Sequence, residues 1–309
     1  METSAWEWTA FAGLLGGLLA LDLFVHRGGR HVSARAALGW SALWISAGLA
    51  FAVVVLIAEG ARGAGEYLAA YAMEKSLSLD NMFVFLVIFQ AFNIPDRNQH
   101  TALAWGIFGA LVFRALFIAA GLEAMQRWSW MPHVLGGLLI AAAIQALRKK
   151  DIGQQSESGL VAWLARRLPV SSDASANRFI VREQGRLLLT PLLAALIAIE
   201  LSDIMFAIDS VPAALAITRH RFIVYSSNAF AILGLRSLYL AVHGYLSELE
   251  YLHYGLAAVL VFAGVKLIGG ESLHLHPLLS AGIIALCVGT AAVASVVRRR
   301  RALATAGSA

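Results

Sequence analysis

Residues 188–211 read LLTPLLAALIAIELSDIMFAIDSV, a mostly apolar run that nevertheless contains Glu200, Asp203 and Asp209. A transmembrane helix needs about 20 predominantly apolar residues, so this run is long enough to cross a bilayer. A charged side chain at the bilayer centre costs about 2.5–3.5 kcal/mol, and such residues usually face a polar cavity on an ion or proton path. The run therefore predicts a membrane helix that carries a functional site.

A second apolar stretch repeats this acidic pattern. Residues 74–81 read EKSLSLDN, in which Glu74 and Asp80 stand six residues apart and an Asn follows. The last two acids of the first run also stand six apart, and a Ser follows them. Six positions of an α-helix correspond to about 240°, so the two acids of each pair cannot share one face of a continuous helix. Pro212 predicts a local unwinding just after the second pair, because proline removes a hydrogen bond inside a helix.

Composition places the whole chain in the membrane. Of its 309 residues, 59% are hydrophobic and only 14% are charged, and the mean hydropathy is +0.72. Soluble domains carry about 25% charged residues. We predict an all-α transmembrane helical bundle of about nine helices, with helical windows at 5–25, 37–59, 66–91, 100–121, 129–147, 188–211, 222–245, 252–270 and 277–297.

The polar stretch 148–187 divides the chain into two hydrophobic halves. We expect an N-terminal transmembrane half at 1–147, a cytoplasmic basic loop at 148–187, a C-terminal transmembrane half at 188–297 and a basic tail at 298–309. Each half follows an acidic helix with a helix that contains an arginine, Arg114 or Arg236. The two acidic helices would cross the membrane in opposite directions, which is the signature of an inverted repeat. Basic residues gather in alternate loops and in the tail, which predicts an outside N-terminus and a cytoplasmic C-terminus.

The embedded residues predict a site for a hard cation. Carboxylate, hydroxyl and amide oxygens suit Mg²⁺, Ca²⁺ or Mn²⁺, whereas the chain offers almost no soft donors at this depth. The expected metal ligands are Glu74, Asp80, Glu200, Asp203 and Asp209. The expected supporting polar residues are Ser78, Asn81, Ser202, Ser210, Arg114 and Arg236.

Charge supports this hypothesis without deciding the ion. The five acids outnumber Lys75, Arg114 and Arg236 by two, so one divalent cation would neutralise the site. Protonation of two acids would do so as well, because burial favours the neutral carboxyl group. Asp22, near the end of the first helix, is either a gate acid or a partner for Arg27 or Arg35.

The sequence contains no motif that indicates another class of function. The chain contains no P-loop, nucleophile elbow, HExxH or dinucleotide-binding pattern, so we expect neither an enzyme nor a permanently bound cofactor. Its basic balance, with an isoelectric point near 9.6, concerns topology and anionic lipid and not nucleic acid. Cys287 is the single cysteine, which excludes an intrachain disulfide.

Residues 74–81 and 203–212 resemble the two signature stretches of the TerC family, which includes the Alx manganese exporters. The segment 231–239, AILGLRSLY, is similar to a flanking segment of that family. The resemblance implies a bacterial inner-membrane protein of the lysine-exporter-like transporter superfamily, with export of Mn²⁺ and a link to tellurium resistance. It also implies that the five embedded acids named above form the family's site.

We therefore expect a secondary transporter that exports Mn²⁺, with proton coupling left open. One alternative is an antiporter that exchanges Ca²⁺ or another cation for protons. A second alternative is a membrane partner for the assembly or metallation of exported proteins, with another protein docked on the loop 148–187.

Overall fold

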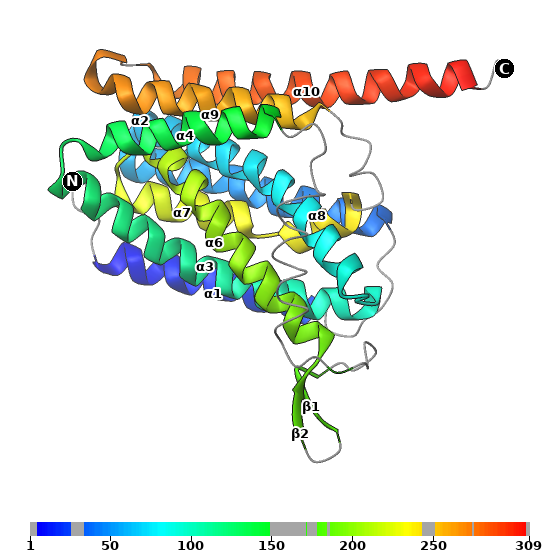
Figure 1. The fold of residues 1–309 in the computed structure, drawn as a ribbon. Coiled ribbons are helices and arrows are strands. Elements are labelled where there is room, and N and C mark those ends of the chain that lie inside the picture. The colour runs from blue at the N-terminus through cyan, green and yellow to red at the C-terminus, as the bar shows by residue number, and fades with distance from the viewer. Residues whose placement is uncertain are drawn as a thin grey trace.

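The computed structural model describes residues 5–25, 34–148, 171, 178–183, 186–242, 251–273 and 275–306. Within these ranges the chain forms an all-α bundle with one small hairpin (Figure 1), which confirms the predicted fold class. Five of the helices are long and apolar enough to cross a membrane. The helices are α1 (Ala5–Val25), α2 (Ala34–Ala91), α3 (Asp96–Arg127), α4 (Met131–Arg148), α6 (Pro191–Ile217), α7 (Arg221–Ile232), α8 (Leu235–Val242), α9 (Leu252–Gly269) and α10 (Pro277–Ala306), the strands are β1 (Ile180–Glu183) and β2 (Arg186–Leu189), and a 3₁₀ turn spans Gly270–Leu273.

Helix α2 folds back on itself at Gly60. This glycine has φ +75° and ψ −176°, which is not helical, and it divides the 58-residue element into two arms. The Tyr67 hydroxyl of the second arm donates a 2.9 Å hydrogen bond to the Gly48 carbonyl of the first arm. In a straight helix these residues would lie about 28 Å apart, so the two arms must pack side by side. The sequence windows 37–59 and 66–91 correspond to these arms.

The single helix predicted at 222–245 is wrong, because the chain breaks between α7 and α8. Gly234 lies in the break with φ +76°, a conformation that favours glycine. A side chain there would overlap the base of the Trp44 side chain on α2. The residues around the break are apolar like the rest of the predicted helix, so Gly234 is the one sign of the turn in the sequence.

Helix α6 starts three residues later than predicted and then continues without interruption. Thr190 caps it, with Oγ1 accepting a 3.3 Å hydrogen bond from the Leu193 amide, and Pro191 occupies the first turn. The preceding residues form β2, which pairs antiparallel with β1 inside the stretch predicted as a loop. Most of that loop, 149–170 and 172–177, lies outside the described residues. Helix α6 is continuous through Pro212 to its end, so the predicted unwinding is not found.

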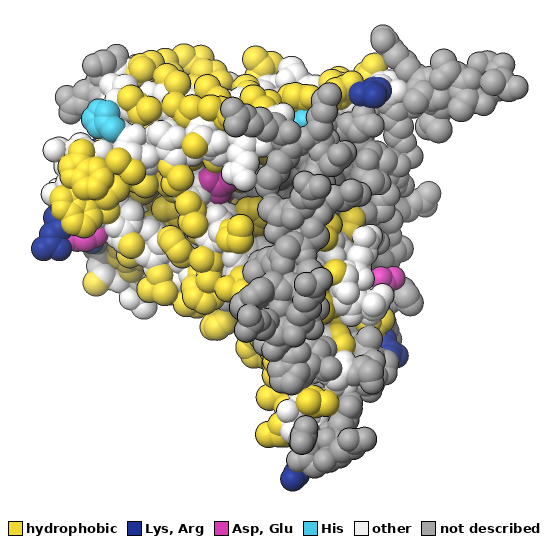
Figure 2. Space-filling view, in the orientation of Figure 1, with side chains coloured by type: hydrophobic (Ala, Val, Ile, Leu, Met, Phe, Trp, Pro, Cys, Tyr) yellow, Lys and Arg dark blue, Asp and Glu magenta, His cyan; other side chains and the backbone are white. Residues whose placement is uncertain are grey.

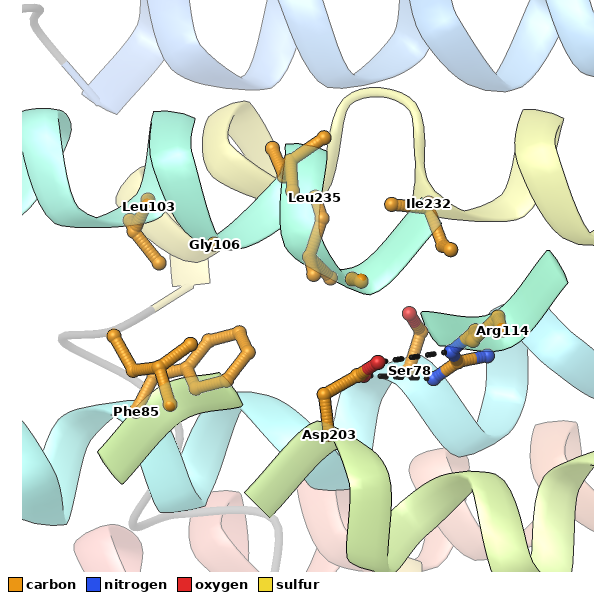
Figure 3. A pocket seen from close by; sticks show the side chains of 11 residues that line it. Ser78, Phe85, Leu103, Gly106, Arg114, Asp203, Ile232 and Leu235 are labelled. Carbon is orange, nitrogen blue, oxygen red and sulfur yellow. Dashed lines mark hydrogen bonds and ion pairs between the residues drawn. The ribbon is translucent and has the colours of Figure 1, made fainter. Parts of the chain in front are cut away.

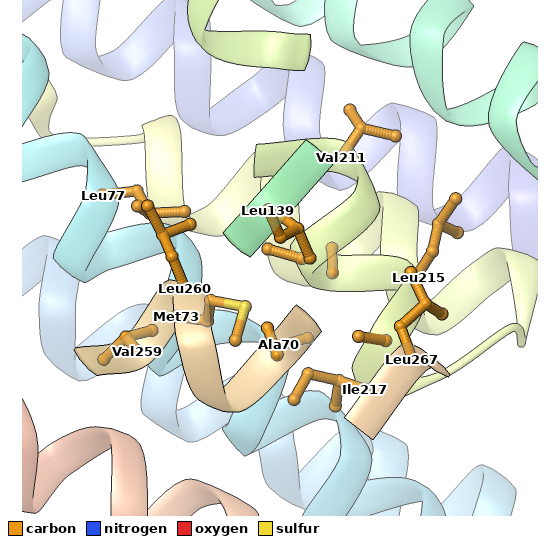
Figure 4. Packing of buried hydrophobic residues seen from close by; sticks show 14 of the residues in the cluster. Ala70, Met73, Leu77, Leu139, Val211, Leu215, Ile217, Val259, Leu260 and Leu267 are labelled. Atoms are coloured by element: carbon orange, nitrogen blue, oxygen red, sulfur yellow. The ribbon is translucent and has the colours of Figure 1, made fainter. Parts of the chain in front are cut away.

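Small residues bring the helices of the core close together. A Cβ on Gly106 of α3 would lie 3.0 Å from Ile199 of α6. A Cβ on Gly136 of α4 or on Gly264 of α9 would lie 2.8 Å from the carbonyl oxygen of the other glycine. Glycines at such crossings let helices approach closely where lipid supplies no hydrophobic driving force. Buried side chains of α2, α4, α6 and α9, among them Met73, fill the neighbouring interior (Figure 4).

The outer surface is apolar, as a lipid-facing surface must be. Large side chains such as Ile57 of α2, Phe108 and Leu116 of α3 and Leu286 of α10 are exposed. In the face shown in Figure 2 hydrophobic atoms cover most of the described surface, and the Lys and Arg side chains lie at its margins. This distribution agrees with a multi-pass membrane protein whose charged groups face the two aqueous sides.

Alanine substitutions at three glycines separate backbone strain from steric overlap. Gly60→Ala should lower stability by about 1–3 kcal/mol through strain alone, because nothing lies within 4 Å of the added carbon. Gly234→Ala should lower it further, since the new atom also overlaps Trp44. Gly17→Ala in α1, with open space around it, is the control. Thermal unfolding in detergent measures all three, and a Gly234→Ala protein as stable as the control would contradict the break at this position.

Candidate functional site

Arg114, in the middle of α3, joins the acidic segments of both halves of the chain. Its Nη1 donates to Glu74 Oε2 on α2. Its Nη2 and Nε donate to the two oxygens of Asp203 on α6 at 3.2 and 3.4 Å. The exposed fractions of the Arg114, Glu74 and Asp203 side chains are 2%, 0% and 6%, so the cluster is buried. A carboxylate from each half thus meets one guanidinium, which neutralises only one of the two charges.

Two further predicted residues on α2 complete the surroundings of Arg114. The Asn81 amide is oriented so that both its oxygen and its nitrogen form hydrogen bonds. The oxygen accepts from Arg114 Nη2 at 3.3 Å, and the nitrogen donates to the Leu77 carbonyl at 3.0 Å. Ser78 lies one turn before Asn81 on the same face and lines a pocket beside the Arg114–Asp203 ion pair (Figure 3). The rest of the pocket wall is mostly apolar and comprises Phe85, Leu103, Gly106, Ile107, Ala110, Ile199, Ile232 and Leu235.

Glu200 lies one turn before Asp203 on α6, and its carboxylate packs against Gly109 of α3. A Cβ on Gly109 would overlap the carboxylate, so this position accommodates Glu200 only because it has no side chain. Glu200 Oε2 is buried and finds no hydrogen-bond partner among the described residues. Its charge interacts with that of Asp203. Two carboxylates bind the Arg114 guanidinium and a third lies beside Asp203, so with all three ionised this region carries two uncompensated negative charges.

The remaining predicted residues of the site either lie outside the Arg114 cluster or have side chains that the structure does not describe. Asp209 lies about 9 Å beyond Asp203 along α6 and is partly exposed. The side chain of Asp80 is not among those described. Ser202 and Ser210 are buried, and the Ser210 hydroxyl has no hydrogen-bond partner in the described part of the chain. Considering only described side chains, no three His, Cys, Asp or Glu residues are close enough together to hold a metal ion.

Arg236 and Asp22 form a separate ion pair, which corrects the expectation that Arg236 supports the acids of α2 and α6. Arg236 Nη2 donates to Asp22 Oδ2 at 2.9 Å and to the Asp22 carbonyl at 2.6 Å. Arg236 therefore binds α1, and among the described side chains it forms no ion pair with an acid of α2 or α6. The side chains of Arg27 and Arg35, which the sequence suggested as partners of Asp22, lie outside those described.

Asn228 of α7 is a polar residue of this region that the sequence reasoning missed. It is 2% exposed and lies beside the Glu74 carboxylate. The run Ser226-Ser227-Asn228 in an otherwise apolar helix is the signal that could have found it.

Removing the guanidinium should reveal how much the cluster depends on it. Arg114→Leu leaves Glu74 and Asp203 buried without their cation, and loss of one partner of a buried ion pair costs about 3–5 kcal/mol. The triple variant Arg114→Leu, Glu74→Gln, Asp203→Asn should recover most of the loss. Thermal unfolding in detergent is the measurement, with Arg62→Leu as control, since Arg62 is 82% exposed beside Glu66. Equal melting temperatures for the Arg114 and Arg62 variants would refute the assignment.

Comparison with known proteins places the chain in a family. The sequence profile of the Integral membrane protein TerC family matches residues 59–303. Membrane protein STKORF319 of Myxococcus xanthus is 42% identical over 96% of this chain and 93% of its own length. Alx of Salmonella typhi, whose name proposes a membrane-bound redox modulator, is 36% identical over 90% of this chain and 89% of its own. Thylakoid membrane protein TERC of Arabidopsis thaliana is 39% identical over 84% of this chain and 68% of its own.

No solved structure matches the chain. The family profile covers most of the sequence, including both acidic segments and the helix of Arg114. The resemblance inferred from residues 74–81 and 203–212 is thus confirmed, and the chain is a member of the TerC family of integral membrane proteins.

Proposed function

We propose that this protein is a secondary transporter that exports a divalent cation across the bacterial inner membrane, with Mn²⁺ as the leading candidate. The observation that supports it is the meeting of Glu74 and Asp203, from different halves of the chain, at one buried guanidinium. Buried ionisable residues in membrane helices usually mark substrate or ion pathways. A site built between two halves of a transporter is also where alternating access places its substrate.

In this proposal Arg114 holds the site together while no cation is bound. A divalent cation has twice the charge of the guanidinium and competes with it for the same carboxylate oxygens. Glu74 and Asp203 would be the first ligands, because they lie closest together, and Ser78 and Asn81 would add neutral oxygens from the same face of α2. These are hard donors, which suit Mn²⁺, Mg²⁺ and Ca²⁺.

The uncompensated charge around Arg114 fits one divalent cation or two protons. Lys75 and Arg236 contribute little to neutralising it, because Lys75 donates to carbonyls of α7 and Arg236 to Asp22. Glu200 is the best candidate for a proton carrier, because its carboxylate interacts with that of Asp203 and its Oε2 is buried without a described hydrogen-bond partner. Proton exchange would then return the site to its empty state after the cation leaves.

Flux of Mn²⁺ into proteoliposomes tests the proposal directly. Asp203→Asn should lower the initial flux by about tenfold or more, which corresponds to about 1.4 kcal/mol of lost cation binding. Glu123→Gln, at an exposed position near the end of α3, is the matched control and should leave flux unchanged. A trapped pH dye reports proton movement, and Ca²⁺ or Mg²⁺ added in competition reports the preferred ion.

Absence of wild-type flux for every divalent cation, in folded protein with an imposed gradient, would overturn the proposal. The same assay tests the two remaining predicted ligands, Asp80 and Asp209. Unchanged flux in Asp80→Asn or Asp209→Asn would remove that residue from the ligand set.

Gly109→Ala tests the role of Glu200 without changing any charge. The added methyl group should displace the carboxylate, and because this is the flexible end of a side chain, the melting temperature should change little. We expect Gly109→Ala and Glu200→Gln to lower flux to a similar extent and the double variant to be no worse than either. Full flux in Gly109→Ala, with flux lost in Glu200→Gln, would separate the two residues and contradict this contact.

A further inference from the structure

The pocket beside the Arg114–Asp203 ion pair extends from that pair in one direction. On α3 every other lining residue precedes Arg114, and on α6 Ile199 lies one turn before Asp203. On α2 Phe85 lies two turns after Ser78. The pocket therefore runs from the ion pair toward the end of the bundle where α2 ends and α3 and α6 begin, which we call the α2–α3 end.

The two ends of this pocket differ in chemistry. Figure 3 shows the polar side chains of Ser78, Arg114 and Asp203 together at one end. Phe85 and Leu103 lie at the other end and are 4% and 2% exposed, so they cover the pocket on that side. Its volume of about 10 Å³ is room for about one water molecule. A hydrated cation can therefore enter only when these apolar side chains move.

The opposite side of the ion pair is filled by apolar side chains. Ile118 of α3 lies one turn beyond Arg114 and is 1% exposed, and Ala207 of α6 lies one turn beyond Asp203 and is 0% exposed. Both belong to the buried cluster that Figure 4 shows in part. Protein interiors are close-packed, so an ion crosses such a region only when helices shift. The described space beside the ion pair thus lies on the side of the α2–α3 end.

Basic residues indicate which side of the membrane this end faces. Phe92, just after α2, and Leu192, in the first turn of α6, belong to one buried apolar cluster, so both helices reach the same end. The basic stretch 148–187 precedes α6 in the sequence, and Lys and Arg gather in cytoplasmic loops. The charge pattern therefore predicts that the α2–α3 end faces the cytoplasm.

We propose that this pocket is the inner part of the passage by which the cation reaches its site from the cytoplasm, and that Phe85 and Leu103 form the gate that closes it. The inference rests on the proposed cation transport and adds the side from which the site is loaded. An apolar constriction blocks ions while it is closed, because it excludes water. An exporter takes its cation from this side, and alternating access then opens the packed opposite side after the gate has closed.

Cysteine labelling tests the passage without measuring transport. Cys287 is the single cysteine, so Cys287→Ser provides a background without thiols. Ala110→Cys in the pocket and Ile118→Cys in the packed cluster each lie one turn from Arg114, on opposite sides of it. A small cationic methanethiosulfonate should modify Ala110→Cys about tenfold faster than Ile118→Cys, because exchange at a thiol depends on access.

Two exposed positions on the same helix report the side from which the reagent arrives. Asp96→Cys and Arg127→Cys lie in the first and last turns of α3. In membrane vesicles, Ala110→Cys should be modified only when the reagent is on the side that modifies Asp96→Cys. Mn²⁺ should slow this modification by occupying the site, and Phe85→Ala should accelerate it by widening the gate.

The possible outcomes separate the passage from the transport function. Modification of Ala110→Cys from the Arg127 side, or at the slow rate of Ile118→Cys, would overturn the passage. Modification that Mn²⁺ does not slow would overturn its assignment to the cation. Ile107→Cys, two turns from Arg114 on the same wall, serves if Ala110→Cys does not fold. Because labelling is read independently of flux, absence of wild-type flux would instead refute the transport function on which the inference rests.

Discussion

A guanidinium held between two carboxylates inside an apolar bundle is the interaction on which the rest of this structure depends. Charges removed from water are tolerated only when their partners are close and well oriented. Arg114 meets this condition by binding Glu74 and Asp203 at once, so α2, α3 and α6 must pack in one register. Gly106 of α3 favours that register, because a side chain there would press against Ile199 of α6.

The two charged pairs of the interior have different roles. Arg236 and Asp22 join α8 to α1, and each has its partner within hydrogen-bonding distance. Around Arg114 two carboxylates bind one guanidinium, and the carboxylate of Glu200 interacts with that of Asp203. The proposed cation, or protons, would balance this excess of buried negative charge.

The polar cluster also adjoins a break in regular helix, at Gly234 between α7 and α8. Ile232 and Leu235 line the pocket next to the Arg114–Asp203 pair and flank the break at Gly234. Lys75, the neighbour of Glu74, binds the carbonyls at the same break. A change in the ligands of Glu74 would therefore act on the break at Gly234, where the helical hydrogen bonds are interrupted.

The sequence by itself determined the class of the protein, most of its helices and the presence of acids within them. Long apolar runs form helices in a membrane because every backbone polar group must be satisfied within the segment, and buried acids identify themselves because they are so costly there. The windows at 37–59 and 66–91 and the acids Glu74 and Asp203 followed from these local rules. The family could be recognised in the same residues.

Only the tertiary structure decided which charges meet. The pairing of Asp22 with Arg236 joins residues 214 positions apart, and nothing in the spacing of either segment predicts it. The break at Gly234 depends on Trp44 of another helix, and the place of Asn228 depends on how α7 docks on α2. Periodicity describes one helix at a time, whereas the partners of a buried charge are set by how several helices pack, and this packing assigned Arg114 to the acids of both halves.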